Sequence, residues 1–258
     1  MTKPLLVLAM PKTGNTTVIE SLRGAGLDVQ RSHFVSEHAF RQAVARVELS
    51  GDERRMSELL DWNERFRKPA ANGFDGSGCR VISLIRDPVA RNVSWLFESS
   101  RLKDPAAARR FRDGTFDLRE LRRRFLEAED HDYTVRWFDR EIRDVFGIDV
   151  FEEPFPHAAG YATYERGDVE LLVLRLEDLS TAGAGALREF LALDGLEMVP
   201  RNVRVTSLAG ELYERFKEEL RLPDEYLERV YSSKPARHFY TVDEIAGFRR
   251  RWSIPRAG

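Results

Sequence analysis

Short apolar runs alternate along this chain with longer segments in which apolar residues recur every three or four positions. The runs at residues 5–9, 80–85 and 171–176 are almost wholly apolar, which is typical of strands buried on both faces of a parallel sheet. A shorter run, residues 27–31, predicts a further strand. Because these strands alternate with helical segments, the pattern predicts an α/β fold with a parallel sheet flanked by helices.

The periodic segments predict helices with charged outer faces. They cover residues 16–25, 37–49, 52–67, 88–99, 117–129 and 133–146. Asp87 followed by Pro88 predicts a helix start, because aspartate is a good N-cap and proline suits the first helical position. More helix follows the last strand, with a turn-like stretch at residues 232–237 before a helix that begins near Val242. No repeat or linker interrupts the sequence, so we expect one domain, residues 1–258.

Composition narrows the classes of protein that fit. The 258 residues include 42% hydrophobic side chains, enough for a folded core, and 33% charged ones whose signs nearly cancel at a net charge of −2. Without a basic surface a nucleic-acid partner is not expected, so an anionic ligand has to be held at a local site. Cys79 is the single cysteine, so no internal disulfide can form. The sequence shows neither a membrane span nor a signal-peptide pattern, and we expect a cytoplasmic protein.

The first candidate site is the loop between the first strand and the first helix. Residues 11–17 read Pro-Lys-Thr-Gly-Asn-Thr-Thr, and a helix start of this kind presents main-chain N–H groups that suit a phosphate or sulfate. Gly14 allows close approach, Lys12 adds positive charge, and Thr16 and Thr17 add hydroxyl groups. A standard P-loop differs, because its lysine follows the glycine. The alternative interpretation is an ordinary turn with a solvated lysine.

A second candidate anion site follows the strand at residues 80–85. Arg86 would lie at the carboxyl end of that strand, the edge where open α/β sheets bind ligands. Its guanidinium group suits a phosphate, and Ser94 in the next helix adds a hydroxyl group. Pairing of Arg86 with a nearby carboxylate explains this motif equally well when it is taken alone. Two anion sites on separate strands suit a nucleotide that carries phosphate at two positions.

The two motifs together resemble those of sulfotransferases that use 3′-phosphoadenosine-5′-phosphosulfate (PAPS). Residues 11–17 are similar to the family's 5′-phosphosulfate loop, and Arg86 with Ser94 is similar to its 3′-phosphate pair, including the spacing. The resemblance implies a P-loop-NTPase-like sulfotransferase fold, PAPS as co-substrate and no required metal ion. The residues that it places at the cofactor are Lys12, Thr13, Gly14, Asn15, Thr16, Thr17, Arg86, Ser94, Lys234 and Arg237.

Some of these assignments have alternatives. Lys234 and Arg237 are assigned because sulfotransferases often close a late basic loop over the nucleotide, but a solvated basic turn is equally plausible. The Glu177-Asp178 pair after a strand is also similar to the family, and capping of the next helix explains it as well. The segments at residues 137–142 and 238–240 resemble a bacterial branch described as capsular polysaccharide synthesis proteins.

The resemblance also implies catalytic roles. Lys12 would stabilise negative charge on the leaving phosphate, as an oxyanion hole does. His33 follows the second predicted strand and is the candidate general base, since an imidazole titrates near neutral pH. A structural histidine is the alternative interpretation of His33, and Glu37 and His38 are the other candidate bases.

Two other functions fit parts of the pattern. A P-loop kinase or NTPase would explain the first loop but not the position of its lysine. A non-catalytic protein that binds adenosine 3′,5′-bisphosphate (PAP) would explain both anion sites without a base. The sequence does not name the acceptor: a glycan, a lipid-linked sugar or a small metabolite with a hydroxyl or amine group would fit.

Overall fold

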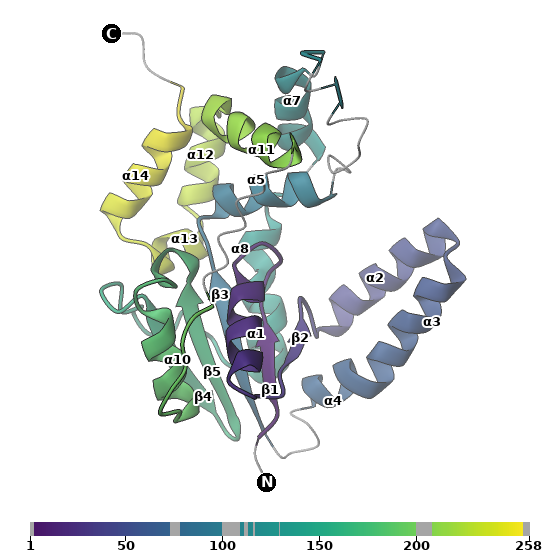
Figure 1. Ribbon diagram of the computed structural model, residues 1–258, viewed down its shortest axis with the longest axis vertical. Helices are drawn as coiled ribbons and strands as arrows, with labels where there is room; N and C mark the ends of the chain where they lie inside the picture. Colours follow the sequence, from purple (N-terminus) through teal and green to yellow (C-terminus); the bar gives the residue numbers. More distant parts are fainter. Residues whose placement is uncertain are drawn as a thin grey trace. The chain divides into compact units, whose positions relative to one another are not determined.

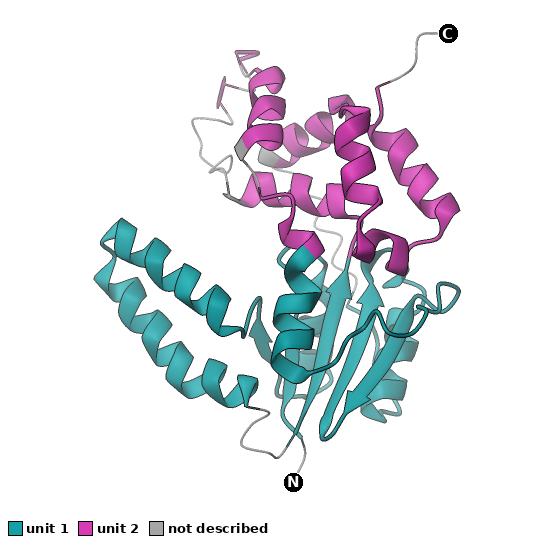
Figure 2. Ribbon diagram, turned by 180° about the vertical axis from the view of Figure 1, so that it is seen from behind, with its two compact units in different colours: residues 1–85, 136–199 teal, residues 86–135, 200–258 magenta. Residues whose placement is uncertain are grey.

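The computed structural model describes residues 3–72, 78–99, 109–110, 113–115, 117–128, 130–199 and 208–254. Its contacts divide the chain into two compact units (Figure 2). Unit 1 comprises residues 1–85 and 136–199, and unit 2 comprises residues 86–135 and 200–258. The expectation of a single domain stays a prediction. The turn-rich loop at residues 73–77 lies outside the described residues.

Unit 1 contains a five-stranded, mostly parallel sheet (Figure 1). Its strands are β1 (Leu5–Leu8), β2 (Gln30–Ser32), β3 (Cys79–Ile85), β4 (Tyr161–Arg166) and β5 (Val169–Arg175). Their order across the sheet is β2-β1-β3-β5-β4. All neighbours pair in parallel except β4, which runs antiparallel to β5 at one edge. The predicted α/β class and the three apolar strands are therefore confirmed.

The sequence misplaced β2 and missed β4. The apolar residues Leu27 and Val29 pack against the core of unit 1, but the ladder to β1 begins only at Gln30. Leu27 and Val29 are therefore apolar because they pack against the core, and not because they belong to a strand. β4 escaped detection because it is a half-exposed edge strand with few apolar residues. Its signal is the two-residue Gly167-Asp168 turn to β5, in which Gly167 has a φ of +57°.

Helices cover both faces of the sheet. The helices α1 (Asn15–Gly24) and α10 (Gly183–Leu191) bury Val18, Leu22 and Leu187 on one face, against alternate residues of β1, β3 and β5. The opposite face carries the continuous segment formed by the end of α8 (Tyr133–Phe138), η2 (Asp139–Arg143) and α9 (Asp144–Phe146), as Figure 2 shows. Trp137, Phe138 and Ile142 of this segment are buried.

A helical hairpin lies beside the β2 edge of the sheet (Figure 1). It consists of α2 (Glu37–Ser50), α3 (Glu53–Trp62), the π-helix η1 (Asn63–Arg67) and α4 (Lys68–Ala71). Gly51 turns the chain between α2 and α3 with a φ of +65°. The predicted helix at residues 52–67 is thus interrupted by η1, whose wider turn carries the buried Arg67.

Unit 2 is built from helices over its described residues. They are the start of α8 together with α5 (Pro88–Ser99), α7 (Leu118–Ala128), α11 (Leu208–Glu219), α12 (Asp224–Tyr231), α13 (Lys234–Phe239) and α14 (Val242–Trp252). Their apolar faces share a core that includes Val93, Phe125, Phe216 and Trp252. Unit 2 therefore has a core of its own, formed from two separate stretches of sequence.

The predicted turn at residues 232–237 is wrong, because Lys234–Phe239 forms α13. Ser233 has the extended backbone of a residue that precedes a helix, and Pro235 occupies the first turn. This start signal resembles that of Asp87 and Pro88, and it outweighs the turn-like pattern of charged residues around it.

Candidate functional site

The carboxyl ends of the parallel strands in unit 1 share one edge of the sheet. The loop at residues 9–14 follows β1, His33 follows β2, and Arg175 ends β5. His33 binds the main chain of Ala9, so the segments after β1 and β2 are in direct contact. The side-chain nitrogen of Asn15 also lies 3.5 Å from Nδ1 of His33, so the structure brings the predicted loop and the predicted base together. Arg86 follows β3 directly in sequence but belongs to unit 2.

The loop after β1 contains two residues with left-handed backbone. Lys12 has a φ of +73° and Gly14 a φ of +90°. A Cβ atom at Gly14 would lie 2.4 Å from Cδ1 of Leu176, so a larger residue would need a left-handed backbone and would also displace that side chain. Lysine has no such freedom, and a left-handed φ costs an L-residue about 1–2 kcal/mol. Strain of this kind persists where the surrounding structure enforces it, which is common at binding sites.

Main-chain N–H groups lie at the amino end of α1. The amide of Thr17 donates to the carbonyl oxygen of Gly14 at 3.1 Å. Within the described residues, no main-chain acceptor outside the helix and no capping side chain pairs with the amides of Asn15 and Thr16. Together with the positive end of the helix dipole, these amides favour an anion.

The side chains of the loop divide into buried and accessible ones. Thr13 is fully buried and its hydroxyl donates to the carbonyl oxygen of Met10 at 2.8 Å, so this hydroxyl holds the turn together. Asn15 is buried, whereas Lys12 and Thr17 are half-buried and Thr16 is exposed. An anion at the loop would thus meet the charge of Lys12 and the two later hydroxyls, while Thr13 could offer its amide.

The shortest hydrogen bond of His33 assigns the hydrogen of a neutral ring to Nδ1. Nδ1 lies 2.8 Å from the carbonyl oxygen of Ala9, which can only accept, so Nδ1 carries the hydrogen. Nε2 then has a lone pair, and Nη2 of Arg31 donates to it at 3.3 Å. A general base needs a lone pair of this kind. The sequence interpretation missed Arg31, although alternate residues leaving a strand point to the same side and Arg31 precedes His33 by two positions.

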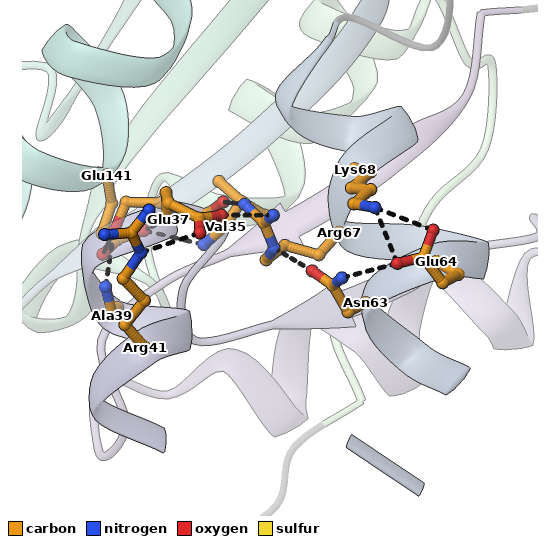
Figure 3. Close-up of polar contacts among 10 residues, drawn as sticks. Val35, Glu37, Ala39, Arg41, Asn63, Glu64, Arg67, Lys68 and Glu141 are labelled. Atoms are coloured by element: carbon orange, nitrogen blue, oxygen red, sulfur yellow. Dashed lines mark hydrogen bonds and ion pairs between the residues drawn. The ribbon is translucent and has the colours of Figure 1, made fainter. Parts of the chain in front are cut away.

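The segment that follows His33 is held by a buried polar network (Figure 3). Glu141 of η2 accepts hydrogen bonds from the amides of Val35 and Ser36 at 2.7 and 2.8 Å, and from the Ser36 hydroxyl at 2.6 Å. Arg67 of η1 donates to the carbonyl oxygen of Val35 and to Glu37. A carboxylate that accepts several hydrogen bonds and a buried guanidinium thus fix the main chain beyond the candidate base.

Trp137 adds one more anchor from the helix opposite α1. Its indole nitrogen donates to the carbonyl oxygen of His33 at 3.1 Å. The sequence placed Trp137 in the core, and it is buried as expected. Glu141 was not singled out as a polar anchor, because nothing in a helical pattern distinguishes an inward carboxylate from a solvated one.

The alternative bases have less suitable surroundings. Glu37 forms ion pairs with Arg41 and Arg67, and hydrogen bonding to Arg41 followed by the charge of Arg67 holds the pKa of Glu37 below its usual value. A lowered pKa makes a carboxylate a weaker base. His38 is exposed on α2, where its ring lies 3.1 Å from the side-chain amide of Gln42. Neither residue shares the contact of His33 with the loop after β1 in the hydrogen bonds of the described residues.

Arg175 and Asp178 have a structural role at the end of β5. The buried Arg175 pairs with Asp178 and donates to the carbonyl oxygen of His157 at 3.1 Å. Gly160 lies against Asp178, and a Cβ there would approach to 2.6 Å. These contacts bind the loop before β4 to the end of β5. Helix capping, the second interpretation of Asp178, is wrong: α10 begins after Ala182 without a capping side chain, and the Asp178 carboxylate pairs with Arg175.

In unit 2 the residue between Arg86 and α5 is a buried carboxylate. Asp87 accepts hydrogen bonds from the Tyr231 hydroxyl at 2.8 Å, the Trp252 indole at 3.2 Å and the Val89 amide at 3.0 Å. Burial raises the pKa of Asp87, while these hydrogen bonds and the charge of Arg86 oppose the rise. Asp87 therefore caps α5 as predicted and also binds α12 and α14.

The predicted phosphate ligands of unit 2 remain predictions. Arg86 and Ser94 are both half-buried. The charge of Arg86 acts on Asp87, which is the kind of carboxylate partner that the alternative interpretation of Arg86 requires. Lys234 and Arg237 are exposed and lie three residues apart on α13, so they share one side of that helix.

Neither a metal site nor a membrane span is found within the described ranges. No three His, Cys, Asp or Glu side chains there gather closely enough to hold a metal ion. None of the described helices combines the length and apolar character needed to cross a bilayer. The predictions that no metal is required and that the protein is cytoplasmic are not tested by these findings.

Comparison with known proteins gives one match. Residues 121–241 match the model of a family described as "Putative capsular polysaccharide synthesis protein". The matched range includes residues 137–142 and 238–240, which carried the resemblance to that bacterial branch. It begins after the loop at residues 11–17, so it does not bear on the sulfotransferase motifs. No curated protein and no solved structure matches the chain.

Proposed function

We propose that this protein is a sulfotransferase that transfers the sulfuryl group of PAPS to a hydroxyl or amine acceptor. The observation that carries the proposal is the loop after β1: a lysine with left-handed backbone, a left-handed glycine packed against Leu176, and helix amides at the carboxyl edge of a parallel sheet. This arrangement suits the 5′-phosphosulfate group. The resemblance of residues 11–17 to sulfotransferases selects PAPS among anionic ligands.

The strained backbone of Lys12 supports a role for its side chain. Glycine would adopt a φ of +73° without strain, so a lysine there indicates that its charge is used. In the proposed reaction the bond between sulfur and the bridging phosphate oxygen breaks as the acceptor oxygen or nitrogen bonds to sulfur. Negative charge then develops on the departing phosphate of PAP, and Lys12 with the loop amides stabilises it.

His33 would receive the acceptor's proton. Its Nδ1 hydrogen is engaged by Ala9, so the proton goes to Nε2. The acceptor group takes the position in which Arg31 now donates to Nε2. The contact of His33 with Ala9 supports this role, because in-line transfer requires a base beside the donor site.

The first acceptor to test is a glycan. The matched family model refers to capsular polysaccharide synthesis, and polysaccharides offer many hydroxyl groups. We would incubate the protein with PAPS labelled in its sulfuryl group and a panel of polysaccharides, lipid-linked sugars and small hydroxyl or amine compounds. Transfer of label is expected with at least one class, and should require His33 and Lys12.

A parallel experiment measures ligand binding by thermal shift. PAP should raise the melting temperature, whereas Mg-ATP should not compete with it. Stabilisation by Mg-ATP with hydrolysis would instead identify a nucleotide kinase or NTPase. Binding of PAP without transfer to any acceptor would identify a non-catalytic PAP-binding protein. Stabilisation by neither ligand would contradict the assignment of the loop.

A further inference from the structure

The edge strand β4 exposes one side of its main chain. Among the described strands β4 is the last of the sheet and pairs with β5 alone (Figure 1). The register joins Tyr161 to Leu174 and Arg166 to Val169, with a two-residue turn between the strands. The amide of Arg175 donates to the carbonyl oxygen of Gly160 at 3.0 Å, which places this pair in the hydrogen-bonded class.

The outward groups follow from this register. Hydrogen-bonded and non-hydrogen-bonded pairs alternate along antiparallel strands. The main-chain N–H and C=O groups of residues 160, 162, 164 and 166 therefore point towards β5. The N–H and C=O groups of Tyr161, Thr163 and Glu165 consequently point away from β5. No other segment of the described chain forms main-chain hydrogen bonds with these three residues. They offer donors and acceptors to one added strand.

A groove runs along the same edge. It has a volume of about 860 Å³ and lies between β4 and the segment from Gly147 to Ala159. All six residues of β4 line it. The segment before β4 is held firmly: Arg175 binds His157, and Arg166 donates to the carbonyl oxygen of Gly147 at 2.6 Å. The groove therefore has one wall made of a free strand edge and another made of an anchored loop.

The groove is acidic. Its lining includes the carboxylates of Asp149, Glu152, Glu153 and Glu165. Arg166 is the one lysine or arginine in the lining, and it is engaged by Gly147. Burial, and then the negative charge of the nearby Glu153, raises the pKa of Tyr164 to about 12. An occupant of the groove should carry positive charge.

We infer that this groove binds an extended, lysine- or arginine-bearing segment of a partner protein as a sixth strand beside β4. The free main-chain groups supply the hydrogen bonds of strand addition, and the acidic lining selects basic side chains. A second copy of this chain does not suit the groove, because pairing of two β4 edges would bring two acidic linings together. The inference does not depend on the proposed sulfuryl transfer.

The test uses an acetylated and amidated peptide of alternating lysine and valine, with amide hydrogen exchange as the readout. Binding should slow exchange at Tyr161, Thr163 and Glu165 by about tenfold or more at saturation. Ala162 and Tyr164 should change little, because β5 already protects their amides. A peptide of alternating glutamate and valine, and a lysine–valine peptide methylated on alternate main-chain nitrogens, should not bind.

Matched variants of the protein separate edge pairing from simple charge attraction. Thr163→Pro removes an N–H that points away from β5 and should abolish peptide binding with the β4–β5 ladder intact. Thr163→Val retains the N–H and should bind the peptide normally. Glu152→Lys combined with Glu153→Lys should weaken binding, since both side chains are exposed in the groove. The melting temperature of each variant reports its folding.

Three results would overturn the inference. One is the absence of protection at all three amides with the basic peptide at millimolar concentration. Another is equal binding by Thr163→Pro and Thr163→Val, which would show that the peptide is held by charge alone. The third is binding of a neutral oligosaccharide in competition with the peptide, which would identify the groove as a carbohydrate site.

Discussion

Nδ1 of His33 donates a hydrogen bond to the carbonyl oxygen of Ala9 across 2.8 Å. The bond joins the residue after β2 to the residue after β1, and it leaves the lone pair of the imidazole on Nε2. The candidate base is therefore oriented by the main chain of the strand that leads into the loop at residues 9–14.

This geometry makes His33→Asn the most informative variant of the base. The asparagine amide can still donate to Ala9, but it has no nitrogen able to accept a proton, so transfer should fall by about 10²–10⁴-fold. PAP binding should stay near that of the wild type. Transfer with labelled PAPS and PAP binding are measured side by side. Glu37→Gln and His38→Asn serve as controls and should do less; if Glu37→Gln alone abolishes transfer, the carboxylate is the base.

The backbone of Lys12 predicts a difference between two variants that both remove its charge. Lys12→Gly relieves the left-handed strain and Lys12→Ala retains it, so the glycine variant should be about 1 kcal/mol more stable towards denaturant. Both should lose most sulfuryl transfer. Chemical denaturation and the transfer assay together separate strain from chemistry. Wild-type turnover in either variant would contradict the leaving-group role.

The assignment of Arg86 and Ser94 predicts selectivity for a 3′-phosphate. PAP should raise the melting temperature, and AMP should give a much smaller shift, because only PAP carries the second phosphate. Arg86→Ala and Ser94→Ala should reduce the PAP shift towards that of AMP and leave the AMP shift unchanged. Equal shifts with both nucleotides in the wild-type protein would remove these residues from the cofactor site.

The buried carboxyl group of Asp87 predicts a pH dependence of stability. Burial raises its pKa in the folded state above the ordinary value of 3.8, so the folded protein binds a proton that the unfolded chain does not. The free energy of unfolding, relative to that of Asp87→Asn, should rise as pH falls through the raised pKa and level off near 3.8. Urea unfolding at a series of pH values measures it.

Asp117 gives a control of opposite sign. It is exposed, and hydrogen bonds from Arg119 lower its pKa. The difference between wild type and Asp117→Asn should therefore shrink as pH falls, and it should be small because water screens the pair. If the free energy of unfolding of the wild type relative to Asp87→Asn also fell towards low pH, the buried carboxyl group would be stabilised as the anion.

Much of unit 1 could be predicted because its strands are apolar on both faces and its helices have one apolar face. Leu5–Leu8 and Cys79–Ile85 have almost no other interpretation. The antiparallel β4 could not be found in this way, since an edge strand buries too little to impose a pattern. The break of the helix at residues 63–67 accompanies a hydrogen bond from Arg67 to Val35, a contact between distant parts of the sequence.

The same reasoning explains what was found and missed at the site. The loop at residues 11–17 is local, so its composition was sufficient to predict a strand, a tight turn and a helix start. His33 could be singled out from its position after a strand. Its contact with Ala9 is expected, because the ends of two adjacent parallel strands lie side by side. Glu141 was missed because its partners, Val35 and Ser36, lie more than a hundred residues earlier in the chain.

The hydrogen bonds of Asp87 to Tyr231 and Trp252 delay part of folding until late in synthesis. Two of its partners, Tyr231 and Trp252, leave the ribosome more than 140 residues later. The described core cluster that α1 and α10 form with the sheet ends at residue 198, whereas Val89 and Phe125 share a core with residues that follow it. A nascent chain must therefore carry an uncovered apolar helix until its last segments emerge. A chain released from the ribosome before Tyr231 should fold its sheet but expose the apolar faces of the unit 2 helices, and should aggregate through them.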